Sequence, residues 1–499
     1  MTTPSSASHR PNTAFDFLRL PGIGALLRHR WGRLPVQLLL TLVALALIID
    51  GFTGPQEAAR NLATIAPWVQ YRGLVVVALL VVGNLFCMSC PFTLPRTLAK
   101  RLSLSGRRFP RRLRNKWLAL AGLFGLFFVY EWLDLWSSPV LTAWVIVAYF
   151  VASFVLEAFF TESAFCKYVC PLGTFNFVYS TLSPSQIGVK NSAVCASCVG
   201  KECVNGSYAP QPIIRVDAIP VAGTDEPIAR TVTHGPQGTL GCGTLLFAPQ
   251  ISSNLDCTFC LDCVRACPHA NVGLMARTPG RELMQPGAWP QRWDVSLLPV
   301  MLTFIGLTNA FAMVPPVYEL QRWLVEVAGL RSEFLVLLLI FTVGNLLLPI
   351  AAITLTAQVG RALTNMRKRY SLRATVATFA PAFVPLGFGI WFAHYSFHFL
   401  ISPLSIIAVF QEFLGMTGAW EQLSGGLSLD AIGLLQVVAL VGGWAWSAWL
   451  VQRAARRLYG RRGFVGQLPW MLLLLVVLLI AVQIFSQPME MRGTEFLFS

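Results

Sequence analysis

Four cysteines in the run Cys257-x-x-Cys260-x-x-Cys263-x-x-x-Cys267, followed by Pro268, are the residues of this chain best suited to chemistry. This is the spacing with which cysteine thiolates bind 4Fe–4S clusters. Two-residue gaps let three thiolates converge on three irons, and the fourth cysteine reaches a second cluster. The alternative is a zinc ribbon, which four thiolates at this spacing with a following proline disfavour. The run therefore predicts iron–sulfur chemistry.

A second cluster needs a second set of ligands, and Cys195, Cys198 and Cys203 lie upstream at a similar but longer spacing. Cys242 is the candidate for the ligand that is still missing. The alternative for Cys242 is a buried free thiol, which would leave one cluster in a three-iron or water-ligated form. If ligands cross between sites, as the ferredoxin spacing implies, one cluster is held by Cys195, Cys198, Cys203 and Cys267, and the other by Cys242, Cys257, Cys260 and Cys263.

Two further cysteine pairs, Cys87 with Cys90 and Cys166 with Cys170, each end in a Cys-Pro dipeptide beside an apolar stretch. The two stretches run in the same direction, so both pairs should emerge at the same membrane depth and could converge into one four-thiolate site. A third cluster, another metal or a redox-active dithiol pair would each fit. The alternative is a pair of helix ends whose cysteines only pack.

His394 and His398 are four residues apart and therefore lie on one face of a helix. Ionisable residues at membrane depth are functional candidates. These histidines could bind a metal or take part in proton release at a quinol site, and Met489 and Met491 offer soft ligands for Cu(I). The alternative is a pair of interfacial histidines bonded to carbonyls or water. Glu157 is the other candidate at membrane depth, either as a proton relay or as the partner of a basic side chain.

The elements that must position these residues are membrane helices, because 55% of the 499 residues are hydrophobic and only 12% are charged. A helix of roughly 20 apolar residues crosses a bilayer. About nine such stretches are predicted, and the second is counted as short: Leu34–Ile49, Leu74–Phe86, Trp117–Leu135, Leu141–Phe160, Val295–Val314, Phe334–Leu355, Val376–Leu400, Ala431–Leu450 and Trp470–Phe485.

The net charge of +15 does not indicate nucleic-acid binding, because the Lys and Arg residues gather in segments between the apolar stretches. They precede the first stretch and follow the second, sixth and eighth, so every basic segment falls on one side of the membrane. The positive-inside rule then predicts a cytoplasmic N-terminus and a C-terminus outside. The long segment after the fourth stretch is also cytoplasmic, where disulfides are disfavoured and clustered cysteines are metal ligands.

The predicted fold is an α-helical polytopic membrane protein with an inserted cytoplasmic domain that resembles a two-cluster bacterial ferredoxin. The expected boundaries follow the apolar stretches and the cysteines. They are a basic N-terminus over 1–33, a four-helix membrane domain over 34–179, the cysteine-rich domain over 180–292 and a five-helix membrane domain over 293–499.

These residues resemble the membrane-bound polyferredoxins of the NapH, NosR and CcoG group over roughly Leu34 to Gln291. Cys166 to Gly173 and Cys257 to Pro268 match that group most closely. Cys87 and Cys90 depart from it, since two residues separate them where the group usually has three. The five-helix half has no counterpart in the NapH pattern.

The resemblance implies a protein of the bacterial inner membrane, with a periplasmic C-terminus. It would pass electrons between a quinone pool or a cytoplasmic donor and a periplasmic reductase, cytochrome or maturation system. The preferred hypothesis is thus electron transfer through two 4Fe–4S clusters, with a third cluster or metal at the Cys-Pro pairs. The alternative, based on His394, His398, Met489 and Met491, is a copper-reducing or copper-handling factor for assembly of a cuproenzyme. The sequence does not decide whether the chain is itself an enzyme.

Overall fold

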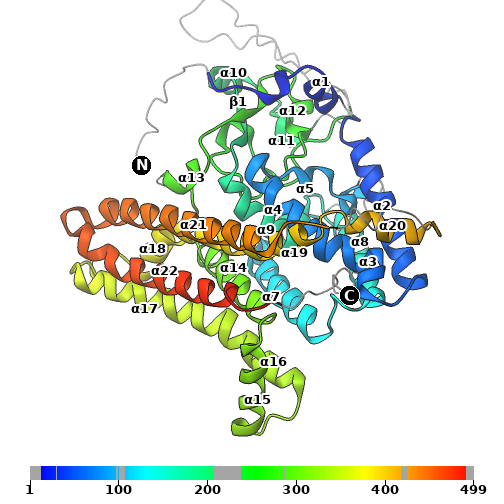
Figure 1. The fold of residues 1–499 in the computed structure, drawn as a ribbon. Coiled ribbons are helices and arrows are strands. Elements are labelled where there is room, and N and C mark those ends of the chain that lie inside the picture. Colours follow the sequence, from blue (N-terminus) through cyan, green and yellow to red (C-terminus); the bar gives the residue numbers. More distant parts are fainter. Residues whose placement is uncertain are drawn as a thin grey trace, which may run out of the picture.

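The computed structural model describes residues 13–29, 31–96, 99, 107–206, 238–285, 287–416 and 425–489, and it is that of a multi-pass helical membrane protein. In Figure 1 the long helices form one body, and the cysteine-rich segment with β1, α10, α11 and α12 lies at one end of it. By length and composition, seven stretches could cross a membrane: Leu34–Thr53, Leu62–Val81, Pro139–Phe159, Trp293–Phe311, Glu333–Leu363, Leu372–Ile401 and Leu429–Phe485.

The last of these stretches contains two helices, α21 (Leu429–Tyr459) and α22 (Gly463–Phe485), joined by the turn Gly460–Arg462. A further apolar helix, α7 (Trp117–Trp132), is shorter than the other eight. Counting α21 and α22 separately and adding α7, the described residues contain nine apolar helices that correspond to the nine predicted stretches.

The second predicted stretch begins too late in the chain. The helix starts at Leu62, runs through α3 (Leu62–Ile65), the π-helical turn η3 (Ala66–Tyr71) and α4 (Arg72–Val81), and ends before Cys87. The expectation of a start at Leu74 was wrong because Gln70 and Arg72 interrupt the apolar pattern, although both side chains are buried. Arg72 therefore lies inside the membrane helix.

Five other membrane segments complete the set, and two of them are interrupted by a short turn of different helical pitch. These are α2 (Leu34–Thr53), α8 (Pro139–Phe159), α14 (Trp293–Phe311), α16 (Glu333–Thr342) continuing through η9 (Val343–Leu347) into α17 (Leu348–Leu363), and α18 (Leu372–Phe379) continuing through η10 (Ala380–Ala382) into α19 (Phe383–Ile401). Two amphipathic helices, α15 (Pro316–Ala328) and α20 (Ser405–Phe413), lie between them along the chain.

Helices α19 and α21 pack closely because glycines remove side chains from their contact. A Cβ on Gly389 would lie 2.5 Å from the carbonyl oxygen of Ala439, and one on Gly443 would lie 2.6 Å from that of Pro385. Lipid offers little hydrophobic driving force for helix association, so such small-residue contacts hold membrane helices together. One buried core joins the two membrane halves, since it includes Leu79 and Leu123 as well as residues from α14 to α22.

The cysteine-rich segment is built around a two-stranded antiparallel sheet of β1 (Ser185–Val189) and β2 (Val272–Ala276), in which Ile187 pairs with Leu274. Between the strands lie three short helices, α10 (Ser192–Ser197), α11 (Glu202–Asn205) and α12 (Asp262–Ala266), and α13 (Arg281–Met284) follows β2. The N-terminal residues cover this segment: Asp16 bridges to Met275, and Arg265 donates from Nη1 to the carbonyl of Leu27 in α1 (Ile23–Arg28) at 2.9 Å.

The basic end of α21 contacts this segment. Arg457, at the end of α21, donates to the carbonyl of Met284 in α13 at 3.1 Å. Arg462 donates to the carbonyl of Thr364, which follows α17, at 2.7 Å. The end of α21 thus contacts the cysteine-rich segment, and the start of α22 contacts the end of α17.

Candidate functional site: three groups of cysteines and a membrane cavity

The loop that carries Cys257, Cys260 and Cys263 has an unusual backbone. Asp256, Phe259 and Leu261 adopt left-handed conformations, with φ of 65°, 53° and 59°. Bulky residues rarely take this conformation, and the strain persists only where the surroundings impose it. Alternation of right- and left-handed residues turns successive amide N–H groups toward one point, a concavity that binds anions and Fe–S clusters. The backbone therefore fits a cluster in this loop.

The loop is fixed in place by the membrane helices. Asn84, just before α5 (Leu85–Ser89), donates to the carbonyl of Cys257 at 3.0 Å. Gly83 has φ of 90°, and a Cβ there would lie 2.8 Å from the ring of Phe259. Only glycine accommodates both the conformation and the contact. The loop is thus held directly against the cytoplasmic end predicted for the second membrane helix.

Cys267 lies with the upstream cysteines and not with the three that precede it. Burial raises the pKa of Cys195, Cys198 and Cys203, the last to about 11, and the nearby Cys267 raises each of them further. One small cavity is lined by all four of these cysteines. They are called group A below: Cys195, Cys198, Cys203 and Cys267.

Cys242 lies with the three cysteines of the left-handed loop. Burial raises the pKa of Cys257, Cys260 and Cys263, and Cys242 contributes to all three shifts. The N–H of Cys242 donates to the carbonyl of Cys203 at 3.0 Å, which brings this group beside group A. The four are called group B: Cys242, Cys257, Cys260 and Cys263.

The two Cys-Pro pairs also come together. Cys87 and Cys166 line one small cavity, and Asn176, in the helix that follows Cys170, donates to Sγ of Cys87 at 3.4 Å. They are called group C: Cys87, Cys90, Cys166 and Cys170. The two pairs thus lie near each other, and a four-thiolate site at this place stays a prediction.

The Cys-Pro dipeptides have a local role that the structure explains. Pro171 begins α9 (Pro171–Tyr179), where its missing N–H costs nothing. Cys170 is the residue before it, and its Sγ accepts a hydrogen bond from the N–H of Gly173 at 3.1 Å. Pro91 likewise begins a helical turn after Cys90, and amides of that turn face its sulfur. Amides at the start of a helix stabilise a thiolate.

A small cavity lined by Cys87, Cys166, Cys260 and Arg96 separates group C from group B. The Arg96 guanidinium lies 3.5 Å from Glu157 and 3.9 Å from Asp262, with all three side chains largely buried. Glu157 is therefore an ion-pair partner, which was one of the two alternatives for it. Groups A, B and C form a series that leads from the cysteine-rich segment to the membrane helices.

All twelve cysteines are free, and within the described residues no three or more His, Cys, Asp or Glu side chains are arranged to hold a metal ion. Thiolates bound to one zinc at about 2.3 Å would lie about 3.8 Å apart. A cluster of four irons holds its thiolates further apart than one zinc does. The buried thiols favour their neutral form, and bound iron would supply the charge that stabilises thiolates.

His394 and His398 are both buried, with ring centroids 5.7 Å apart. The Nε2 atom of His394 lies 3.1 Å from Sδ of Met313, a residue that sequence analysis did not select. Met489 is buried in the same core, whereas Met491 lies outside the described residues. The metal role of the two histidines stays a prediction.

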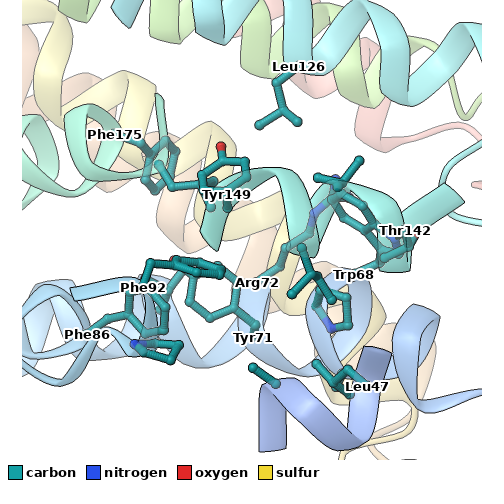
Figure 2. A pocket seen from close by; sticks show the side chains of 18 of the residues that line it. Leu47, Trp68, Tyr71, Arg72, Phe86, Phe92, Leu126, Thr142, Tyr149 and Phe175 are labelled. Carbon is teal, nitrogen blue, oxygen red and sulfur yellow. Dashed lines mark hydrogen bonds between the residues drawn. The ribbon is translucent and has the colours of Figure 1, made fainter. Parts of the chain in front are cut away.

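A cavity of about 230 Å³ lies in the membrane part, between α2, η3, α4, α7, α8, α9 and α19. In Figure 2 the side chains of Trp68, Tyr71, Arg72 and Tyr149 converge on this space from two helices. Arg72 lies under the rings of Trp68, Tyr130 and Tyr395 at 4.4 to 5.0 Å and donates to the Tyr130 hydroxyl at 3.1 Å. Tyr71 and Tyr149 lie near group C, since Pro91 and Leu172, which follow Cys90 and Cys170 closely, line the same cavity.

Sequence analysis did not select the polar residues of this cavity. Arg72 could have been found, because a single arginine between the apolar segments Leu62–Ile65 and Leu74–Val81 is a functional candidate once the helix is extended to Leu62. Tyr149 gives no such signal, since tyrosine is ordinary in an apolar helix. Arg96 resembled any other member of a basic loop.

In comparisons with protein-family models, with curated proteins and with solved structures, nothing matches this chain. The function must therefore be argued from the cysteine groups and the cavity.

Proposed function

We propose that the chain is a membrane electron-transfer protein that holds three 4Fe–4S clusters, one in each of groups A, B and C. The observation that carries the proposal is the arrangement of all twelve cysteines in three sets of four. Two of these sets have the crossed wiring that the ferredoxin spacing implies. Such clusters supply one-electron transfer when bound.

The chain's own residues would tune and connect the clusters. Asn271 donates to Sγ of Cys195 at 3.1 Å, and Asn176 donates to Sγ of Cys87 at 3.4 Å. Hydrogen bonds to cluster sulfurs and ligands adjust reduction potentials. Arg96 places a buried positive charge between groups B and C, where it would favour the reduced state of both. Electrons would pass along the series between a partner at the cysteine-rich end and a partner in the membrane.

The proposed location is the bacterial inner membrane, with the cysteine-rich segment on the cytoplasmic side. The contact of Arg457, in the basic end of α21, with Met284 of this segment supports it through the positive-inside rule. The proposed relationship is to the polyferredoxin group of NapH, NosR and CcoG, on the residues quoted above. Redox partners of reductase or cytochrome type follow from that relationship.

Iron analysis with low-temperature EPR tests the proposal. Protein purified without oxygen and reconstituted with iron and sulfide should contain about 12 irons per chain, four for each cluster. Reduction should produce the EPR signals of more than one 4Fe–4S centre. Protein that stays without iron and sulfide after reconstitution would remove the proposal.

A second candidate function, copper reduction or handling, is favoured by the contact between His394 and Met313 at 3.1 Å. Nitrogen and thioether ligands suit Cu(I). Copper bound per chain should fall in a His394→Ala, Met313→Ala double variant relative to the wild type. Equal copper content in the two proteins would leave the histidines as packing residues.

A further inference from the structure

The membrane cavity beside group C has the features of a binding site for a lipid-soluble redox molecule. Its walls are apolar over most of their area, and none of its lining residues is a histidine, cysteine or methionine. It therefore offers no histidine, cysteine or methionine ligand for haem iron. A cavity of about 150 Å³ already holds a benzene ring, so 230 Å³ accommodates a substituted ring system.

The cavity is reached from the lipid. Val43 of α2 lines it and is also 42% exposed, so the wall formed by α2 meets the outer surface of the helix bundle. Leu39 and Leu42, close to Val43 along α2, are 60% and 64% exposed. An apolar tail could thus remain among lipids while the ring occupies the cavity.

Two polar groups in the cavity have the chemistry to bind carbonyl oxygens. The hydroxyl of Tyr149 is buried, and among the described residues no hydrogen-bond partner lies within reach of it. A buried hydroxyl without a partner costs free energy, which a ligand that accepts its hydrogen bond would recover. Arg72 supplies a buried positive charge from η3–α4, below the Tyr130 and Tyr395 rings. Figure 2 shows Tyr149 and Arg72 at the same cavity.

We propose that this cavity binds the head group of an isoprenoid quinone, with the Tyr149 hydroxyl donating to one carbonyl and Arg72 with Tyr130 forming the polar end of the site. The proposal rests on the proposed function, since group C would exchange electrons with the bound ring. A ring held here lies beside the helix turns that carry Cys90 and Cys170, because Pro91, Phe92 and Leu172 line the same cavity.

Oxidation of a bound quinol would break two O–H bonds, release two electrons one at a time to clusters held by the cysteine groups, and release two protons to water. A second, water-sized cavity adjoins the site, because Trp68, Arg72 and Tyr130 line both. It is also lined by Thr64 and His398, and so it leads protons away from the cysteine-rich end. Quinone reduction reverses each step.

The test measures binding of decylubiquinone to the purified protein by quenching of tryptophan fluorescence, since Trp68 lines the cavity. Tyr149→Phe should raise Kd threefold to tenfold, the effect of one lost hydrogen bond. Ala44→Trp, which fills the cavity from α2, should abolish binding. Tyr459→Phe is the matched control, because it removes a buried hydroxyl from the far half of the bundle and should leave Kd unchanged.

Iron content and EPR of each variant separate this inference from the proposed function. Wild-type affinity in both Tyr149→Phe and Ala44→Trp, or wild-type protein that binds phospholipid but no decylubiquinone, would overturn the quinone site while leaving the clusters intact. Reduced protein should be reoxidised by decylubiquinone in stopped-flow measurements, and more slowly in Tyr149→Phe. Wild-type protein that contains no iron after reconstitution would instead contradict the proposed function. The binding measurement would still decide whether the cavity binds a quinone.

Discussion

Replacement of Cys267 by serine should remove the cluster of group A, although Cys267 is only four residues from Cys263 in the sequence. The structure places Cys267 beside Cys195, Cys198 and Cys203, whose pKa values it raises. Three clusters of four irons give about 12 irons per chain, so the variant should retain about 8. Group B should keep all four of its thiolates.

The assay is iron and sulfide analysis combined with EPR of the reduced protein, and Cys263→Ser is the reciprocal control. Each variant should lose about one third of the iron, but the two should lose different EPR signals. The double variant Cys263→Ser, Cys267→Ser should retain about 4 irons, from group C alone. Crossed ligation predicts this additivity because the two cysteines serve different clusters.

Local ligation would give another result. If Cys257, Cys260, Cys263 and Cys267 held one cluster together, Cys263→Ser and Cys267→Ser would lose the same EPR signal, and the double variant would lose no more iron than either. That outcome would refute the division into groups A and B.

Three further predictions concern the surroundings of the clusters. Arg96→Gln should lower the melting temperature in detergent, because the ion pair of Arg96 with Glu157 at 3.5 Å is worth about 5 kcal/mol at an effective dielectric constant of about 20. Adding Glu157→Gln should restore part of this loss of stability. A double variant no more stable than Arg96→Gln alone would contradict the ion pair. The same Arg96→Gln change should lower the reduction potentials of groups B and C in an EPR titration, while Arg369→Gln, at the exposed end of the distant α17–α18 loop, should not. Gly83→Ala should destabilise the protein by about 1–3 kcal/mol through its positive φ and disturb the group B signal through Phe259, whereas Gly125→Ala, with nothing within 4 Å of its Cβ, should have little effect.

The membrane helices could be predicted from the sequence because hydropathy is a sum over many residues. The nine stretches agree with the helices, and the error at the second stretch came from two polar residues, Gln70 and Arg72. Gln70 donates to Oγ of Ser405 at 3.1 Å, and Arg72 is covered by aromatic rings. Partners from distant segments thus make these residues compatible with a membrane helix, and hydropathy contains no information about such partners.

The grouping of the cysteines was predictable to a different degree. Spacing alone suggested that Cys267 serves a distant cluster and that Cys242 completes the other. Two helices running in the same direction suggested that Cys87, Cys90, Cys166 and Cys170 could converge, but their approach depends on how η4 (Pro91–Thr93) and α9 (Pro171–Tyr179) turn after each Cys-Pro dipeptide. The cavity could not be predicted, because it depends on how the side chains of six membrane helices pack against one another.

Arg72 belongs both to a membrane helix and to the lining of the cavity. A buried guanidinium is costly in a membrane unless the fold compensates it, and here Tyr130 and Tyr395 do so from α7 and α19. α19 belongs to the five-helix half, which has no counterpart in the NapH pattern. Because α19 supplies Tyr395 to the cavity and His398 to the adjoining small cavity, that half would complete the quinone site and its proton path. Tyr395→Phe, which keeps the ring over Arg72, should therefore preserve decylubiquinone binding, whereas Tyr395→Leu, which removes it, should weaken binding without loss of iron; unchanged binding in both would mean that the four-helix half forms the site alone.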